Sequence, residues 1–267
     1  MTLFHLFILA VIQGLTEFLP VSSSAHLILL PQLSGMQDQG LVIDISVHVG
    51  TLGAVILYFW KDVRAVLAGV LDVLRGRMTT PGARLALLFA LATVPVVLAG
   101  LLLNLAGLEE AMRSIKVIGW AMLLFGLVLY WFDQRGPSHK TASDWTVRDA
   151  LILGLWQAVA LIPGTSRSGI TITGARALGY TRTDAARLSM LMSVPTIFAS
   201  GMLLGGEVAA TANWQAAKDG AIAAALAFVA ALLALTLMMR LLRSVSYTPY
   251  VVYRVILGAV LLWIAYT

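Results

Sequence analysis

The chain has 267 residues, of which 60% are hydrophobic and only 12% are charged, and its mean hydropathy is +0.90. Soluble domains carry about 25% charged residues, so this composition excludes an ordinary soluble protein and predicts an all-α integral membrane protein. The net charge of +5 comes from scattered basic residues, which argues against a nucleic-acid partner, and the lack of cysteine excludes disulfides and thiol nucleophiles.

The first apolar segment, residues 3–16, is too short to cross a membrane. It is followed by Glu17, Pro20 and a second short apolar run that starts at residue 27. A spanning helix needs about 20 mainly apolar residues, so we expect this pair of short segments to enter the membrane and turn back. The segment has no charged amino-terminal region and no A-x-A site, and we expect it to be retained rather than removed as a signal peptide.

A second short pair lies further along the chain, and six other segments approach or reach the length of a membrane span. Residues 150–162, then Pro163 and a polar cluster, and then residues 169–178 repeat the plan of the first pair. The predicted spans are residues 41–60, 84–104, 115–132, 186–205, 217–239 and 249–266.

The two short pairs resemble each other in sequence. "VIQGLTEFLPVSSSAH" and "GLWQAVALIPGTSRSG" share a Gln, an apolar stretch, a Pro and a Ser-rich turn, with one residue of slippage between the Gln and the Pro. Such internal similarity is typical of membrane folds with duplicated halves. We therefore predict one membrane domain, residues 1–267, made of two repeats at about 1–110 and 111–267.

The distribution of basic residues orients the predicted spans. If the loop at 61–83 is cytoplasmic, most basic residues fall on the cytoplasmic side, as the positive-inside rule requires. Under that orientation the first short pair enters from outside and the second from inside, so the repeat is inverted. The cytoplasmic set is Lys61, Arg64, Arg75, Arg77, Arg84, Arg135, Lys140, Arg148, Arg176, Arg182, Arg187, Arg240 and Arg243, against Arg113, Lys116 and Lys218 outside.

The two turns have the composition of an anion site. Pro20 and Pro163 are each expected to end a half-helix, and the serines that follow are good N-caps for the next one. Helix N-termini offer unpaired N–H groups and partial positive charge, and an inverted repeat would bring two of them face to face. Arg167 adds a cation suited to phosphate oxygens, and Gly164 lets the backbone approach a ligand closely. A Ser-rich turn can also be a simple cap, but together these features predict a buried anion pocket.

Four side chains near the first turn suggest chemistry. His26 follows Ser23 by three positions, so the two can share a helix face as base and nucleophile, although a lone His in an apolar helix is as often structural. Gln13 and Glu17 also share a face, and Glu17 could hold Mg²⁺ or Ca²⁺ if Gln13 and substrate phosphates completed the site. Structural pairing is the alternative for Glu17, and snorkelling to the interface is the alternative for Arg167.

Asp44 and His48 have the same spacing as Gln13 and Glu17, near the start of the first predicted span. They could join the pocket, although an interfacial cap and a buried, hydrogen-bonded histidine are the more common roles for such residues. His5 and His139 carry no functional signal.

At "QGLTEFLPVSSSAH" and "PGTSRSGITIT" the sequence resembles the undecaprenyl-diphosphatase family, and the resemblance covers nearly the whole chain. The motifs of that family are E/Q-x-x-x-E leading into a Pro-Val-Ser-Ser run with a nearby His, and PGxSRSxxT. The resemblance implies hydrolysis of undecaprenyl diphosphate to undecaprenyl phosphate and inorganic phosphate, with a divalent cation, in the bacterial cytoplasmic membrane and at a site open to the outer face. The expected partners are the polyprenyl diphosphate substrate and membrane lipid, and a homodimer is a further expectation.

The motifs imply specific roles in this chain. Ser23 would attack phosphorus after deprotonation by His26 or Glu17, or a water would attack with His26 as the base. Many family members have Glu where this chain has Gln13, which weakens the prediction of a two-carboxylate metal site. A secondary transporter or lipid flippase that binds an anionic head group at mid-membrane is the competing class. The residues implied are Gln13, Glu17, Ser22, Ser23 and His26 in the first motif, and Ser166, Arg167, Ser168 and Thr171 in the second.

Overall fold

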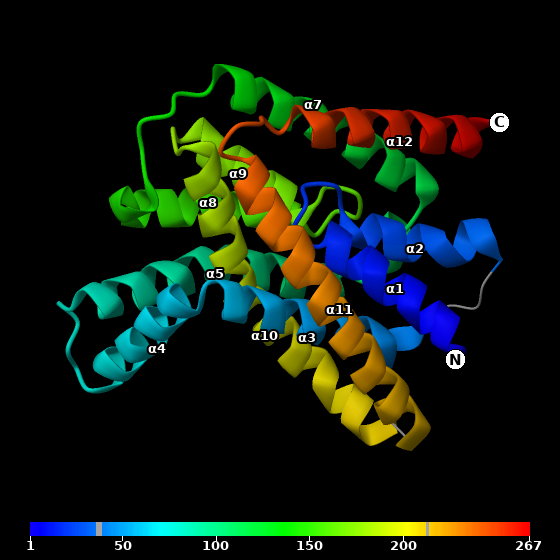
Figure 1. The fold of residues 1–267 in the computed structure, drawn as a ribbon, viewed down its shortest axis with the longest axis horizontal. Helices are drawn as coiled ribbons and strands as arrows, with labels where there is room; N and C mark the ends of the chain where they lie inside the picture. The colour runs from blue at the N-terminus through cyan, green and yellow to red at the C-terminus, as the bar shows by residue number, and fades with distance from the viewer. Residues whose placement is uncertain (36–38, 212–213) are drawn as a thin grey trace.

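The computed structural model describes residues 1–35, 39–211 and 214–267, and none of these residues forms a β-strand (Figure 1). Within them, five helices are long and apolar enough to cross a membrane, and they coincide with five of the predicted spans. The prediction of an all-α, multi-pass membrane protein is therefore confirmed at this level. The five helices are α3 (Gly40–Tyr58), α5 (Pro81–Leu105), α7 (Ile115–Arg135), α11 (Trp214–Leu241) and α12 (Thr248–Tyr266).

The remaining predicted span, residues 186–205, lies within the long helix α10 (Arg182–Thr211). In the part of the chain that the structure describes, α10 is not among the helices that meet the length and hydropathy conditions for a span. Its first turns carry Arg182, Asp184 and Arg187, and Pro195 lies inside it. Six membrane crossings therefore stay a prediction.

The two short pairs are helix–turn–helix units. Their first helices end earlier than predicted, because α1 ends at Thr16 and α8 at Val159 rather than at the prolines. In the second turn, main-chain bonds from Leu161 to Ala158 and from Ile162 to Val159 replace α-helical bonds before Pro163 is reached. The helices of the pairs are α1 (Leu3–Thr16), α2 (Ser23–Ser34), α8 (Val147–Val159) and α9 (Arg167–Ala177).

The predicted cytoplasmic loop at 61–83 is largely helical, which corrects the sequence prediction. Helix α4 (Trp60–Leu74) runs through most of it and packs against α5. The contact is close, since a Cβ added to Gly69 would lie only 2.0 Å from the carbonyl oxygen of Gly82. The charged residues of this segment do not prevent a helix. Two short elements complete the chain, α6 (Glu109–Met112) and a 3₁₀ turn at Ala142–Asp144.

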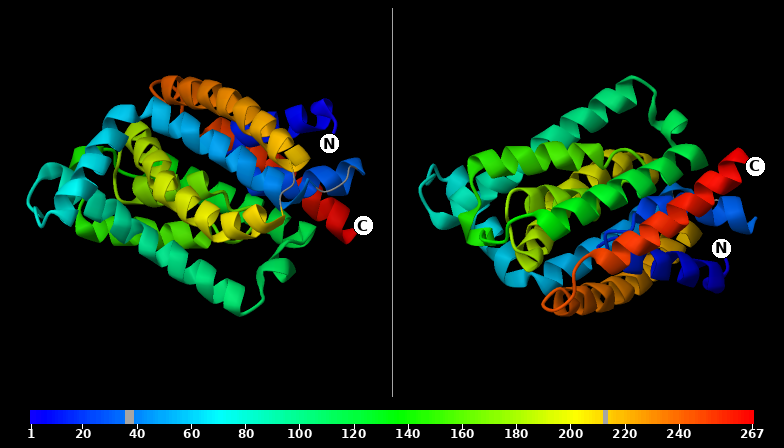
Figure 2. Two further views of the ribbon diagram at one scale, coloured as in Figure 1. Left: turned by 90° about the horizontal axis from the view of Figure 1, so that it is seen from below. Right: turned by 90° about the horizontal axis from the view of Figure 1, so that it is seen from above.

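Each half of the chain packs into the other. Helix α1 packs against α11, and α8 packs against α5, so each short first helix lies on a long helix of the other half. Helix α3 also packs along α11, and α7 lies beside α12 (Figure 1). The two termini lie at one end of the molecule and the α4–α5 connection at the opposite end, as all the ribbon views show (Figures 1 and 2). The turns of the two short pairs are thereby brought into the interior.

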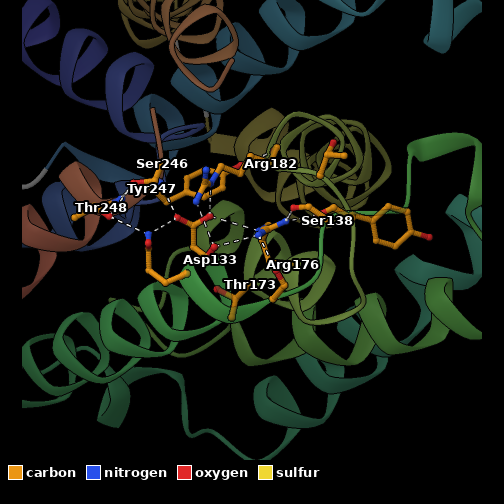
Figure 3. A network of polar contacts seen from close by, with 12 residues as sticks. Asp133, Ser138, Thr173, Arg176, Arg182, Ser246, Tyr247 and Thr248 are labelled. Carbon is orange, nitrogen blue, oxygen red and sulfur yellow. Dashed lines mark hydrogen bonds and ion pairs between the residues drawn. The ribbon is translucent and has the colours of Figure 1, made fainter. Parts of the chain in front are cut away.

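A buried ionic network fixes the second short pair to its neighbours (Figure 3). The side chain of Asp133 is fully buried at the end of α7 and accepts hydrogen bonds from Arg182 Nε at 2.7 Å and from the backbone N–H of Tyr247 at 3.1 Å. Arg176 Nε lies 3.4 Å from the same carboxylate, and Arg176 also donates to the carbonyl oxygen of Tyr180 at 2.5 Å. The network joins the ends of α7, α9, α10 and α12, and so holds α9 in place.

Candidate active site

The two turns touch each other although they are far apart in sequence. The Oγ of Ser168 donates a hydrogen bond to the carbonyl oxygen of Leu19 at 3.0 Å. Arg167 Nη2 forms an ion pair with Glu17 Oε1 at 2.9 Å, and both side chains are largely buried. The two turns, and with them the starts of α2 and α9, therefore meet at this contact, and anion binding there stays a prediction.

The N-caps of α2 and α9 have the same unusual backbone. Ser22 has φ 73° and Ser166 has φ 70°, and these are the only residues other than glycine with positive φ in the described chain. Each follows a completely buried glutamine, Gln13 or Gln157, by the same number of residues. The two turns differ by one residue in the spacing from glutamine to proline, but the spacing from glutamine to N-cap is the same in both.

The residue after each N-cap carries a functional group. Ser23 is the first residue of α2 and Arg167 is the first residue of α9. The predicted nucleophile and the predicted phosphate ligand thus occupy equivalent positions in the two turns. The caps themselves differ, because the Ser166 side chain accepts from the N–H of Gly169 at 3.1 Å whereas Ser22 makes no such side-chain cap. The N-terminus of α2 is therefore the less capped of the two, which suits binding of an anion.

Glu17 is the centre of the polar contacts. Its Oε2 accepts hydrogen bonds from Ser23 Oγ at 2.6 Å and from Gln13 Nε2 at 3.0 Å, while its Oε1 is bound by Arg167. His48 Nε2 lies 3.9 Å from Oε2, which is too long for a hydrogen bond. The sequence pattern predicted Glu17 with Gln13 on one face of α1, and the structure adds that Glu17 is in contact with the hydroxyl of Ser23.

The ring nitrogens of His26 contact neither Ser23 Oγ nor Glu17. Its Nδ1 lies 2.6 Å from the carbonyl oxygen of Ser22, and its Nε2 lies 2.6 Å from the hydroxyl of Tyr253 on α12. The ring is also stacked on Tyr253, with 5.8 Å between the centroids. Of the two bases considered for Ser23, Glu17 is the one that the structure places in hydrogen-bond contact, and a catalytic role for His26 stays a prediction.

A cavity of ≈ 360 Å³ opens beside Glu17, between the two turns and helices α3 and α10. Asp44 and His48 line it, although structural roles were the more common expectation for them. His48 Nδ1 donates to the carbonyl oxygen of Asp44 at 2.7 Å, so its Nε2 faces Glu17. The other polar residues of the lining are Glu17, Ser22, Ser23, Ser24, Ser166, Arg167, Thr196 and Ser200.

A second cavity of ≈ 290 Å³ shares part of this lining. Ser24, Asp44 and His48 border both cavities. The second one continues past apolar side chains to Met112 and Arg113, at the connection between α5 and α7. The first cavity therefore lies at Glu17, and the second extends from the shared residues to the end of the molecule at which that connection lies.

The site includes polar residues of α10 that the sequence analysis missed. Arg167 Nη1 donates to the carbonyl oxygen of Ser189 at 3.1 Å, and Thr196 and Ser200 line the cavity. Ser189, Ser193, Thr196 and Ser200 recur at three- and four-residue intervals within an otherwise apolar segment. A helix places such positions on one face, so this periodicity was a readable signal for a polar face directed inward.

Three residues predicted to bind substrate, two from the second motif and Gly164, lie beside the cavity lining rather than in it, as far as the described residues show. Ser168 is bonded to the first turn, and Thr171 Oγ1 lies 2.5 Å from Ser189 Oγ. Gly164 has φ +90°, and a Cβ there would lie 2.6 Å from the carbonyl oxygen of Ile118. The structure therefore explains this glycine by backbone conformation and packing against α7, and the binding roles of the three residues stay predictions.

The donors near Glu17 match a cation only when substrate completes the shell. No group of three or more His, Asp or Glu side chains in the described chain could hold a metal ion. Gln13 Oε1, however, is buried without a hydrogen-bond partner in the amide that donates to Glu17. Mg²⁺ is commonly bound by one or two carboxylates together with substrate phosphates. A carboxylate and an unpartnered amide oxygen fit that mode of binding.

Comparison with known proteins places this arrangement in a family. The family model described as bacitracin resistance protein BacA matches residues 6–260. The chain is 71% identical to an undecaprenyl-diphosphatase of Ruegeria pomeroyi and 70% identical to one of Dinoroseobacter shibae, over the full length of each. It is 48% identical to an undecaprenyl-diphosphatase of Chromohalobacter salexigens, with 98% of each chain covered. The chain therefore belongs to the BacA family of bacitracin resistance proteins.

Proposed function

We propose that the chain hydrolyses undecaprenyl diphosphate to undecaprenyl phosphate and inorganic phosphate. Full-length similarity to relatives named for this activity supports the substrate. The observation that carries the chemistry is the contact of Ser23 with Glu17, opposite Arg167, at the edge of a cavity bounded by two helix N-termini. A hydroxyl bonded to a carboxylate and facing a cation is suited to attack on a phosphoryl group.

In the proposed reaction the terminal phosphoryl group lies between the N-termini of α2 and α9. Its oxygens replace Glu17 as the partner of Arg167, which leaves Glu17 able to accept the proton of Ser23. The Oγ of Ser23 then bonds to phosphorus as the bond to the bridging oxygen breaks, and undecaprenyl phosphate leaves with the electron pair of that bond. Water hydrolyses the phosphoserine, which restores Ser23 and releases inorganic phosphate. Attack by water with His26 as the base is the second possible chemistry.

A divalent cation would bind at Glu17 and Gln13 Oε1 together with the phosphates. When bound, it would neutralise charge on the departing phosphate oxygens. Arg167 and the free N–H groups at the start of α2 would supply the remaining stabilisation from the protein itself.

We also propose that α10 crosses the membrane as a sixth span and that the two short pairs are re-entrant, as an inverted repeat. The equivalent N-caps of the two turns and the matched packing of α1 on α11 and α8 on α5 support this arrangement. The positive-inside distribution then assigns the end that contains Arg113 to the outer face. The second cavity leads toward Arg113, so the site would open outward in the bacterial cytoplasmic membrane.

Phosphate release from undecaprenyl diphosphate by purified protein in detergent with Mg²⁺ tests the function. Wild type should release phosphate, Ser23→Ala should release none, and Ser244→Ala should match wild type because Ser244 is an exposed cytoplasmic-end residue. Release by Ser23→Ala at the wild-type rate would assign the attack to water. Folded wild type that releases no phosphate would contradict the proposal and favour the transporter interpretation.

A further inference from the structure

Arg254 is a completely buried cation in the first half of α12. Its guanidinium donates to carbonyl oxygens of Ala121 at 3.3 Å and Met122 at 3.2 Å on α7. It also donates to one carbonyl in each turn, Pro20 at 3.3 Å and Gly164 at 3.2 Å. Within residues 1–35, 39–211 and 214–267, no Asp or Glu forms an ion pair with it. A buried charge is costly unless its donors are satisfied, so the four carbonyls are what stabilise Arg254.

The two carbonyls in the turns are equivalent. Pro20 precedes the N-cap Ser22 by the same number of residues as Gly164 precedes the N-cap Ser166. Both lie outside the helices, and no backbone N–H in the described chain donates to either of them. An unsatisfied buried carbonyl costs about 1–3 kcal/mol. The single side chain of Arg254 therefore donates a hydrogen bond to the backbone carbonyl at the same position of each turn.

The surroundings of Arg254 are shaped to admit it. A Cβ added to Gly169, in the first turn of α9, would lie 2.8 Å from Arg254 Nη1. A Cβ added to Gly126 on α7 would lie 3.3 Å from the Cβ of Arg254. The guanidinium thus lies in a space that two glycines keep open between α7, α9 and the turns.

We propose that Arg254 is a positioning residue that holds the two turns in register. Ser23 and Arg167 each follow one of the bonded carbonyls at the same spacing, so fixing those carbonyls fixes the nucleophile and the phosphate ligand relative to each other. The kinetic part of this inference rests on the proposed phosphatase function. The structural part concerns only the distance between the turns, and can be tested separately.

The kinetic test compares Arg254→Met and Arg254→Lys with Arg84→Met, at a temperature where all are folded. Arg84 on α5 is the control, since it also donates to a main-chain carbonyl, that of Trp145 at 3.4 Å, but away from the turns. A displacement of about 1 Å can cost about 100-fold in rate, so Arg254→Met should lower kcat about 100-fold with a smaller change in KM. Arg254→Lys, with three donors in place of five, should recover part of that loss. Arg84→Met should keep the wild-type kcat.

The structural test uses the fact that the natural chain has no cysteine. Cysteines introduced at Gln32 on α2 and Ala177 on α9 would carry spin labels, and the distance between the labels would be measured by pulsed electron paramagnetic resonance. Arg254→Met should broaden or shift the distance distribution relative to the protein with Arg254, and Arg254→Lys should lie between them.

A folded Arg254→Met variant with near-normal kcat would overturn the inference, and so would lost activity with an unchanged distance distribution. If Arg254→Met does not fold, the kcat and the label distance of Arg254→Lys test the inference in its place. Failure of wild type to hydrolyse the lipid would contradict the proposed function alone, because the distance measurement does not depend on activity.

Discussion

At the scale of single residues, one carboxylate organises the site. Glu17 binds Ser23 through one oxygen and Arg167 through the other, and so links the two turns as well as polarising a hydroxyl. Because Glu17 is buried, losing either contact would leave a buried charge without a partner, which is energetically costly. Removing either partner would therefore be expected to disturb both the chemistry and the joining of the turns.

Gln13, whose side chain donates to Glu17, allows a test of cation binding. Gln13→Glu would add a second carboxylate next to Glu17 and should lower the Mg²⁺ concentration for half-maximal activity by about tenfold, since an added charge at about 4 Å contributes one or more kcal/mol. Phosphate release measured against Mg²⁺ concentration checks this.

Gln157→Glu is the matched control for that prediction. Gln157 is the equivalent buried glutamine of the second turn, and it donates to Thr196 rather than to Glu17. The control should leave the Mg²⁺ dependence unchanged. An equal shift in both variants would show a general effect of charge, and no shift in Gln13→Glu would contradict a cation at Glu17.

At the scale of helices, close backbone contact holds the two halves together. A Cβ added to Gly50 on α3 would lie 2.1 Å from the carbonyl oxygen of Ala224 on α11. Two helices can approach this closely only where a glycine leaves room, as is common in membrane proteins. The position of α3, which carries Asp44 and His48 into the cavity, therefore depends on this contact.

Gly50→Ala should separate α3 from α11 and lower stability by about 1–3 kcal/mol, the usual cost of overpacking. Thermal unfolding in detergent measures the effect. Gly53→Ala on the same helix is the control, because its Cβ would meet only the ring edge of Phe228 at 3.2 Å, and that ring can shift. Equal melting temperatures for the two variants would contradict the role of the backbone contact.

At the scale of the whole molecule, the ends of the bundle differ in charge and in access. The termini and the α5–α7 connection face one way, and the α4–α5 connection faces the other (Figures 1 and 2). Asp133 lies near the end of α7 that is farther from the α5–α7 connection. The second cavity reaches Met112 and Arg113 at the first end. Orientation in the membrane therefore decides from which side the site is reached.

Single cysteines in the cysteine-free chain test that orientation. Leu108, in the α5–α7 connection, is 49% exposed, and Leu74, at the end of α4, is 77% exposed. In intact cells, a membrane-impermeant maleimide should label Leu108→Cys, and should label Leu74→Cys only after the membrane is opened. The reverse pattern would place the site on the cytoplasmic side.

Much of this molecule could be predicted from the sequence, for physical reasons that act locally. Long apolar segments favour membrane spans because lipid cannot satisfy an exposed backbone, and five of the predicted spans are helices long and apolar enough to cross a membrane. The same reasoning located the two short pairs and the serine N-caps, since length, proline and serine act within a few residues. It placed the turns near Pro20 and Pro163 but missed that α1 and α8 end earlier.

What only the tertiary structure decided depends on contacts between distant segments. The sequence spacing favoured His26 as the base for Ser23, with Glu17 as the alternative. Only the tertiary structure shows that His26 contacts Tyr253 on α12 while Glu17 contacts the hydroxyl of Ser23. Arg254 is visible in the sequence as a charge within a predicted span. Its partners are main-chain carbonyls of α7 and both turns, and only the tertiary structure brings these together. Sequence determines which elements form, since helix length and caps are local, whereas the assembled site depends on which elements meet.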